Sequence, residues 1–230
     1  MSTLSELLRE MPVAADESGI PIRTQTRAQT IDFPTDSIRD EQIHALVQQL
    51  FFRPEVGLVR NVGFTPADES TSGAALCLEV ARTLAEEGKY DVGLIDASSG
   101  RIPLHQQLQI PAPTQAGVTW RVAPRLSLVP RPSWWREGGL QRVTPENLEQ
   151  LREFITGFDF SILCCAPVSW LTARIAQNCD GVVLVLTANK TRRLVAAQIK
   201  DRLSKAHVPL LGTILVERRF PVPKGLYRSL

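Results

Sequence analysis

The sequence predicts an α/β protein: a doubly wound, mostly parallel sheet with helices on both faces. Apolar runs of strand length alternate along the chain with segments whose apolar residues recur at helical spacing. The runs are nearly continuous in Val, Ile and Leu, which is typical of strands buried on both faces. Because parallel strands need a crossover connection, the intervening helices complete the pattern.

The N-terminal half is expected to hold two helices and three strands. The first helix, 37–52, starts at Ser37, a suitable N-cap, and carries apolar residues three and four positions apart. The run LVRNVGF predicts a strand at 58–64, and an amphipathic pattern predicts a helix over roughly 71–87. The segments DVGLID and LSLVP predict strands at 91–96 and 126–130.

The C-terminal half continues the alternation. PENLEQLREFITG predicts a helix at 145–157, FDFSILCCA predicts a strongly apolar strand at 158–166, and another helix begins near Trp170. Three more elements follow: a strand at 181–187, a helix at 191–207 and a last strand at 209–216.

Composition restricts the function. The 230 residues are 43% hydrophobic and 22% charged, which is ordinary for a globular core. The net charge of +2 is too small to indicate a nucleic-acid surface by itself. No apolar segment approaches the ~20 residues of a membrane helix, and the N-terminus lacks the basic-then-apolar order of a signal peptide. A cytoplasmic protein is therefore expected.

The domain organisation is expected to be simple. Residues 1–36 are polar, contain prolines and lack periodicity, so they are predicted to be a tail or linker that could lie along the domain. Residues 37–230 are predicted to form a single domain. The four cysteines match no zinc-site spacing, and we interpret them as small apolar residues in a reducing compartment: Cys77, Cys164, Cys165 and Cys179.

Ligands of an open parallel sheet bind at the carboxyl ends of the strands, so the loops there are the candidate sites. The loop after the first strand would be a phosphate loop, which needs glycines, a lysine for the outer phosphates and a hydroxyl for Mg²⁺. The segment PADESTS, beginning at Pro66, supplies hydroxyls from Ser70, Thr71 and Ser72 but contains no glycine, and no lysine precedes Lys89.

Two carboxylates stand in the same loop, where an anion would have to sit. Asp68 and Glu69 would repel a triphosphate. Acidic side chains complement the partial positive charge of a helix N-terminus. We therefore expect these two residues to cap the first turn of the following helix in place of the missing anion.

Two more loops carry candidate residues, each with two interpretations. Asp96 ends a predicted strand, where its carboxylate could order magnesium or water, or cap a neighbouring turn. Lys190, Arg192 and Arg193 lie near a helix start, where they could meet an acidic partner or phosphate, or simply be solvated.

With these loops placed, the chain from about Glu41 onward resembles the cytoplasmic kinase domain of bacterial tyrosine kinases, the capsular and exopolysaccharide biosynthesis P-loop proteins related to the MinD/ParA ATPases. Members of that family read EAFRxLRTNL, SxxPGEGKST, LLIDADLRRPSLH, LPxG, YDxVIIDxPP, DGVxLVV and LGxVLN in this order. This chain reads EQIHALVQQL, FTPADESTS, GLIDASSGRIPLHQQL, LSLVPRP, FDFSILCCAPV, DGVVLVLTANK and LLGTILVERR.

The departures from the family pattern fall on the residues that bind nucleotide and metal in that family. The family's phosphate-loop lysine falls on Ser70, the second acid of its LIDAD motif falls on Ser98, and the aspartate of its VIID strand falls on Cys164, a poor magnesium ligand. The two arginines that the family uses for ring assembly fall on His44 and Val47. The resemblance therefore implies a degenerate nucleotide site at Pro66, Asp68, Glu69, Ser70, Thr71, Ser72, Asp96 and Cys164.

The resemblance implies a pseudokinase: a non-catalytic partner in exopolysaccharide or capsule biosynthesis, with no ATP or magnesium cofactor. Its expected partner is the cytoplasmic region of a membrane polysaccharide copolymerase or a related kinase, which would bring it to the inner face of the membrane; a homo-oligomer also fits. Candidate partner-binding residues are Glu41, His44, Trp134, Trp135, Arg192, Arg193 and Tyr227.

The implied alternatives keep some chemistry. A divergent ATPase or tyrosine kinase would use Thr71, Ser72 and Asp96 for magnesium and an arginine, Arg101 or Arg192, in place of the lysine. A DNA-binding role has little support, because no basic stripe interleaved with aromatic residues occurs. The tryptophan-containing loop and the C-terminal tail could instead pack on the domain.

Overall fold

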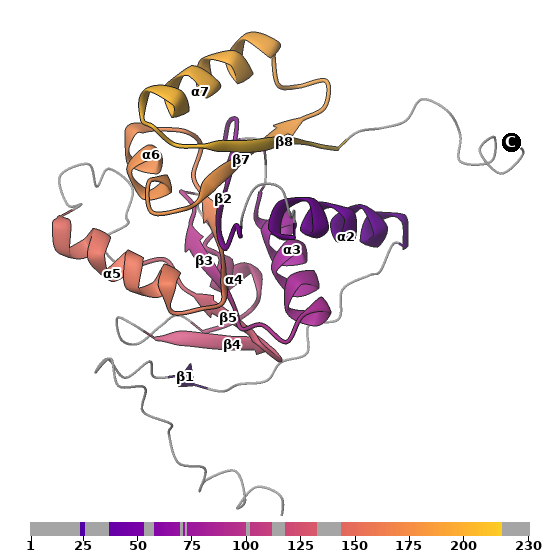
Figure 1. Cartoon of the computed structure of the whole chain (residues 1–230), viewed down its shortest axis with the longest axis vertical. Helices are drawn as coiled ribbons and strands as arrows, with labels where there is room; N and C mark the ends of the chain where they lie inside the picture. The colour runs from indigo at the N-terminus through magenta and orange to yellow at the C-terminus, as the bar shows by residue number, and fades with distance from the viewer. Residues whose placement is uncertain are drawn as a thin grey trace, which may run out of the picture.

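The computed structural model describes residues 24–25, 37–52, 58–69, 71, 73–99, 102–111, 118–132 and 144–217. Figure 1 shows one sheet with helices on both of its faces. The strands are β1 (Thr24–Gln25), β2 (Asn61–Pro66), β3 (Val92–Ala97), β4 (Thr119–Ala123), β5 (Leu126–Val129), β6 (Phe160–Cys165), β7 (Gly181–Thr187) and β8 (Leu210–Val216). The helices are α2 (Ser37–Phe51), α3 (Ala74–Glu87), α4 (Leu104–Gln107), α5 (Pro145–Thr156), α6 (Trp170–Ala176) and α7 (Arg193–Lys205).

The sheet confirms the predicted α/β fold. Its strand order is β1-β4-β5-β3-β6-β2-β7-β8. Every neighbouring pair is parallel except β4 and β5, which form an antiparallel hairpin. Strand β3, the next strand in the chain after β2, lies on one side of β2, and the later strands β7 and β8 lie on its other side. The direction in which strands are added to the sheet therefore reverses near β2.

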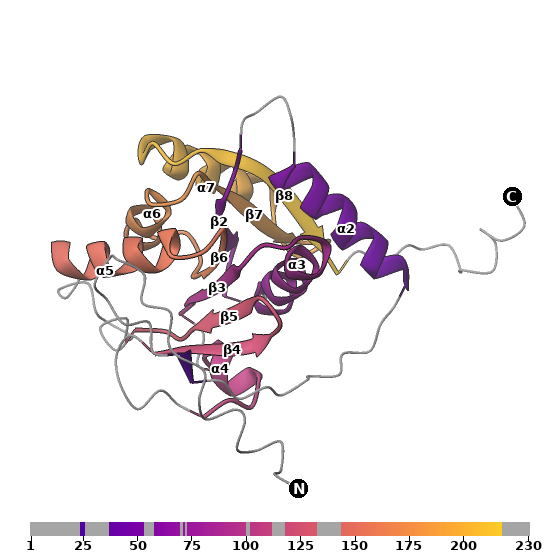
Figure 2. The same cartoon turned by 60° about the horizontal axis from the view of Figure 1, so that its bottom comes forward.

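One group of helices covers each face of the sheet, and both Figure 1 and Figure 2 show this arrangement. Helices α2 and α3 share one buried cluster with alternate residues of β2, β3 and β6. Helices α5 and α6 pack on the opposite face against β3, β5 and β6, while α7 packs on β7. Strand β6 contributes to both faces, since Ile162 lies in one cluster and Leu163 in the other.

Most predicted boundaries agree with the structure, but β2 starts later than the expected strand at 58–64. The N–H groups of Arg60 and Asn61 both donate to the carboxylate of Asp180, at 2.7 and 2.8 Å. Strand pairing begins at Asn61 with β6 and at Val62 with β7, and it continues to Pro66, which lies beside Val185.

Two features of the sheet differ from the prediction. Strand β4 was not expected; it exists because the chain reverses at Arg125, whose φ of 60° lies in the left-handed region, and pairs back on β5. Strand β8 is apolar but is not buried on both faces. It is an edge strand, and each of its residues is partly or fully exposed.

The first 36 residues are described only at Thr24 and Gln25. These two residues pair with Thr119 and Trp120 of β4 and add β1 to that edge of the sheet. Within the described residues, no helix is long and apolar enough to span a bilayer.

Candidate functional site: the carboxyl edge of the sheet

The candidate site is the edge where the parallel strands β2, β3, β6 and β7 end. Register places Asp96 of β3 beside Cys164 of β6, and Cys164 beside Phe64 of β2. The structure therefore brings together the loops in which the sequence analysis placed the degenerate nucleotide site. The contacts that these side chains make decide what the edge can bind.

The loop between β2 and α3 is closed by its own side chains. Asp68 Oδ1 accepts hydrogen bonds from the Thr71 N–H at 3.0 Å and from the Thr71 hydroxyl at 3.1 Å. The Thr71 hydroxyl also lies 2.8 Å from that of Thr187 on β7. Because the single Thr71 hydroxyl proton is already donated to Asp68, the Thr187 hydroxyl is the donor in this contact. Thr71 is buried, and its hydroxyl donates one internal hydrogen bond and accepts another.

The expected capping role of Asp68 and Glu69 was wrong. Helix α3 begins at Ala74 with Gly73 as N-cap, has no acidic residue in its first turn, and makes no side-chain cap. Asp68 instead closes the turn that precedes the helix, and Glu69 is exposed. The reason is that the loop between β2 and α3 is longer than predicted. Both carboxylates therefore lie several residues before the first residue of the helix. Ser70 and Ser72 lie outside the described residues.

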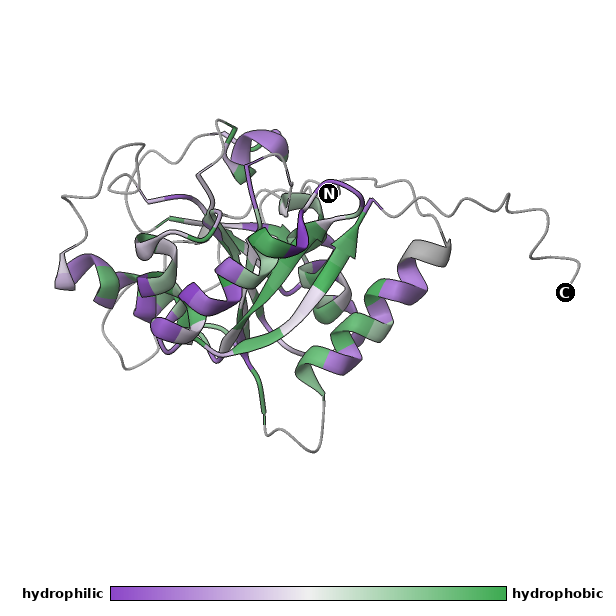
Figure 3. Ribbon diagram, turned by 90° about the horizontal axis from the view of Figure 1, so that it is seen from above, coloured by the Kyte–Doolittle hydropathy of each residue, from purple (hydrophilic) through white to green (hydrophobic). Residues whose placement is uncertain are grey.

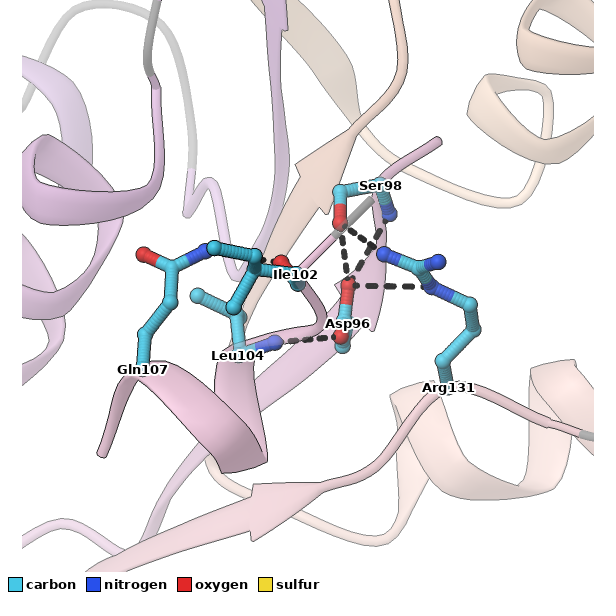
Figure 4. Close-up of polar contacts among 6 residues, drawn as sticks. All are labelled: Asp96, Ser98, Ile102, Leu104, Gln107 and Arg131. Carbon is cyan, nitrogen blue, oxygen red and sulfur yellow. Dashed lines mark hydrogen bonds and ion pairs between the residues drawn. The ribbon is translucent and has the colours of Figure 1, made fainter. Parts of the chain in front are cut away.

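Asp96 is fully buried, and both of its oxygens are occupied (Figure 4). Oδ1 accepts from the Ser98 hydroxyl at 2.6 Å and from the Ser98 N–H at 3.1 Å. Oδ2 accepts from the Leu104 N–H at 2.8 Å, at the start of α4. Of the two interpretations, the geometry agrees with the carboxylate that caps a neighbouring turn.

The cation beside Asp96 is Arg131, a residue that the sequence analysis did not single out. Its Nε lies 3.8 Å from Asp96 Oδ1, and its terminal nitrogen donates to the Ser98 hydroxyl at 2.7 Å. Arg131 comes from the segment after β5, the spatial neighbour of β3. Its signal in the sequence was a basic residue between two prolines, directly after a predicted strand and thus at the same edge of the sheet.

A buried histidine adjoins this pair. His105 of α4 is buried, and its Nδ1 has no hydrogen-bond partner among the described residues. Burial lowers the pKa of His105; the Asp96 carboxylate opposes this shift and the Arg131 guanidinium adds to it. The imidazole therefore favours its neutral form in the folded protein.

The cysteines behave as the small apolar residues that were expected. Cys164, at the position where an active relative would carry aspartate, is buried beside the Cys77 thiol of α3, and burial raises the pKa of Cys77. On the other face, burial raises the pKa of Cys165 and raises that of Cys179 to about 12. All four are free thiols; Cys77, Cys164 and Cys165 are buried, and Cys179 is partly buried.

The basic loop after β7 is only partly engaged. Lys190 Nζ lies 2.9 Å from Glu217 Oε2, which closes the loop onto the end of β8. Arg192 and Arg193 are exposed at the start of α7. These two arginines keep the exposure that a partner-binding role needs.

The α2 positions that matter for ring assembly in the resembled family serve the fold here. Val47 is fully buried in the core between α2 and α3. His44 donates from Nδ1 to the Asp40 carbonyl at 2.8 Å, and its Nε2 lies 3.5 Å from Glu87 at the end of α3. Glu41 is exposed. The other candidate residues, Arg101, Trp134, Trp135 and Tyr227, lie outside the described residues.

The two described oxygen groups at this edge that could meet a metal already make internal contacts. The Thr71 hydroxyl hydrogen-bonds to Asp68 and Thr187, and the Asp96 carboxylate accepts from Ser98 and Leu104 and pairs with Arg131. Across the described part of the chain, no three His, Cys, Asp or Glu side chains gather into a metal-binding group.

Comparison with solved structures shows which fold this is. The VpsO kinase domain matches with a TM-score of 0.64 at 18% identity, covering 79% of this chain and 97% of that one. The kinase domain of the Escherichia coli tyrosine kinase ETK matches with a TM-score of 0.63 at 16% identity, covering 86% of each chain. A ParA family ATPase from Chlorobium tepidum matches with a TM-score of 0.57 at 18% identity, covering 68% of this chain and 73% of that one. At these identities the likeness shows a shared P-loop NTPase-like fold; no protein-family model and no curated protein matches the sequence.

Proposed function

We propose that the protein is a non-catalytic pseudokinase that regulates exopolysaccharide or capsule assembly by docking on a polysaccharide copolymerase or on a related kinase at the cytoplasmic face of the membrane. The fold shared with tyrosine kinase domains and the motif order of the sequence support the family. In such a role the domain acts as a partner of fixed shape rather than as a phosphoryl-transfer enzyme.

One observation carries the non-catalytic part of this proposal. The buried Asp96 carboxylate forms an ion pair with Arg131 of the same chain, and both of its oxygens accept hydrogen bonds. Phosphoryl transfer depends on a metal ion and positioned positive charge around the phosphates. The Arg131 guanidinium lies beside this carboxylate, and the neighbour of Asp96 on β6 is Cys164 rather than a second carboxylate.

A divergent ATPase is the second candidate, and one observation favours it. The N-terminus of α3 carries no side-chain cap. Its N–H groups could therefore receive an anion, as helix N-termini do in nucleotide-binding folds. Weak nucleotide binding at this helix is the property that separates the two functions.

Calorimetric titration of the full chain with ATP and Mg²⁺ tests the proposal. We expect no binding tighter than about 100 μM, or about −5.5 kcal/mol, while the ETK kinase domain serves as the positive control under the same conditions. Tighter binding by this chain would refute the pseudokinase and favour the ATPase.

The docking role needs a separate test. The immobilised cytoplasmic tail of a polysaccharide copolymerase from the same organism is expected to retain the wild-type protein, with or without ATP. An Arg192→Glu, Arg193→Glu variant should be retained less, because these exposed arginines are the candidate contacts. Equal retention of both proteins would show that the arginines are not part of the docking surface. If neither protein were retained, the copolymerase tail would not be the partner.

A further inference from the structure

Strand β8 forms one edge of the sheet that the structure describes, and its residues are not of the kinds that usually protect an edge. It is the last strand of the sheet, with β7 as its one neighbour among the described strands. Its sequence, LLGTILV, contains no charged residue and no proline. Natural proteins normally protect such an edge with lysine, proline or a covering element, because unpaired N–H and C=O groups recruit another strand. In Figure 3 this strand is the green ribbon with a pale middle that runs between α7 and α2.

The side chains of β8 leave room for another strand. Thr213 and Leu215 point to one face and are exposed, and 51% of the Leu215 surface is accessible. On the other face, a Cβ atom added at Gly212 would meet no atom within 4 Å among the described residues. The edge therefore combines an exposed large apolar side chain with open space beside a glycine.

The regular part of β8 is self-complementary. The register with β7 shifts between Val182 and Val183, so a bulge interrupts β8 before Gly212 and the uninterrupted strand is 212–216. In an antiparallel pair of two identical strands, residues that oppose each other must point to the same side. A two-fold axis at the central residue, Ile214, satisfies this rule and pairs all five residues.

From this register we propose that two copies of the chain associate through β8 and form one continuous sheet across the two-fold axis. Ile214 would oppose Ile214 of the second copy, and Thr213 would oppose its Leu215. Val216 would lie opposite Gly212 of the second copy, where the open space is. None of the five paired residues carries a charge, and the isologous contact closes on itself as a dimer.

This inference does not rest on the proposed function. A partner strand of unrelated sequence, or residues 218–230 of the same chain, would not require the two-fold register. The pairing of Thr213 with Leu215 of the second copy gives the proposal its specific test, because each copy then places the same two positions against each other. Charges of one sign at both positions repel across the interface of such a dimer.

The experiment is a charge-swap complementation on the full chain, followed by light scattering and sedimentation. Wild type is expected to dimerise. Thr213→Lys, Leu215→Lys and Thr213→Glu, Leu215→Glu double variants should each weaken the dimer at least about 100-fold, since both substituted positions are exposed and the fold is unaffected. An equimolar mixture of the two should regain a dimer.

A control variant carries the same two added charges elsewhere: Gln106→Lys, Thr156→Lys, both on exposed helix positions. It should dimerise as wild type does. Three results overturn the proposal: a wild type that stays monomeric at every concentration, charge variants that still dimerise alone, or a Lys and Glu mixture that remains monomeric. Circular dichroism of each double variant confirms that loss of the dimer is not loss of the fold.

Discussion

Asp96 shows how a single buried carboxylate sets the character of the carboxyl edge. Its negative charge is balanced by Arg131, and its oxygens fix the turn at Ser98 and the start of α4. These atoms hold the loop to the sheet. Loss of the carboxylate charge would remove a buried counter-ion from the partly buried arginine.

Replacement of Asp96 by Asn is expected to lower the free energy of unfolding by about 3 kcal/mol, because a buried ion pair loses one partner. Urea denaturation measures the change. The matched control is Glu149→Gln, which removes the anion of an exposed pair with Arg152 and should change stability little. If Asp96→Asn, Arg131→Met is no more stable than Asp96→Asn alone, the two residues are not coupled.

His105 is expected to make stability depend on pH. Its pKa is lowered in the folded state, so the unfolded chain binds more protons below the ordinary value of about 6.5. Stability is therefore fully present above this pH and falls as the pH decreases through it. Urea denaturation at a series of pH values between about 5 and about 8 gives the free energy of unfolding as a function of pH. The slope of that dependence should be smaller in the His105→Phe variant.

The exposed His207 provides the control for that slope. Its φ of 55° is left-handed, which asparagine tolerates, so His207→Asn should keep both the fold and the wild-type pH dependence. A slope that survives in His105→Phe would assign the pH dependence to other groups.

At the scale of elements, the packing of α2 on α3 accounts for two departures from the resembled family. Val47 fills the core between these helices, while His44 and Gln48 reach Glu87 at the end of α3. The helix is therefore held by its own domain through the positions that a ring-forming relative would present to a neighbour. Restoring the family residues should have opposite outcomes at the two positions.

Val47→Arg is expected to lower the melting temperature by about 10 °C or more, because it places a charge in a fully buried position. His44→Arg should melt as wild type does, since 52% of that side chain is exposed and Glu87 remains its partner. Differential scanning calorimetry compares the two. Equal melting of both variants would contradict the buried position of Val47.

The elements most open to prediction were those whose pattern is local. Continuous apolar runs predicted β3, β6 and β7 almost to the residue, because these central strands bury nearly every side chain. Strand β4 was missed because its existence depends on a reversal at Arg125 and on pairing with β5. The edge position of β8 was also hidden, since LLGTILV has the composition of a central strand.

The location of the candidate site could be predicted from the sequence, but the hydrogen bonds and ion pairs within it could not. Strand ends and loop order located Asp68, Asp96 and Cys164 at one edge, since parallel strands end together. The partner of Asp96 could not be inferred, because Arg131 follows a strand that becomes its neighbour only through sheet order. The capping role of Asp68 depended on where α3 begins, a boundary that periodicity leaves uncertain by a few residues.

At the scale of the whole molecule, β6 joins the two faces of the sheet into one structure. Its successive residues Ile162 and Leu163 lie in opposite clusters, one under α3 and one under α5 and α6. A cavity on one face therefore weakens the strand on which the other face also packs. We expect the two layers to unfold as one cooperative unit.

Leu163→Ala is the test of this cooperativity. It should lower the free energy of unfolding by about 2–5 kcal/mol, and hydrogen exchange should show the same decrease for the slowest amides of α3, on the face that the mutation does not touch. Leu194→Ala, at a side chain that is 69% exposed, is the control and should leave exchange unchanged. If α3 kept its wild-type protection while α5 lost its own, the faces would be separate units, and the sheet would transmit no change from one layer to the other. With one cooperative unit, by contrast, anything that docks on either layer stabilises the whole sheet, including the edge that holds Asp96 and Arg131.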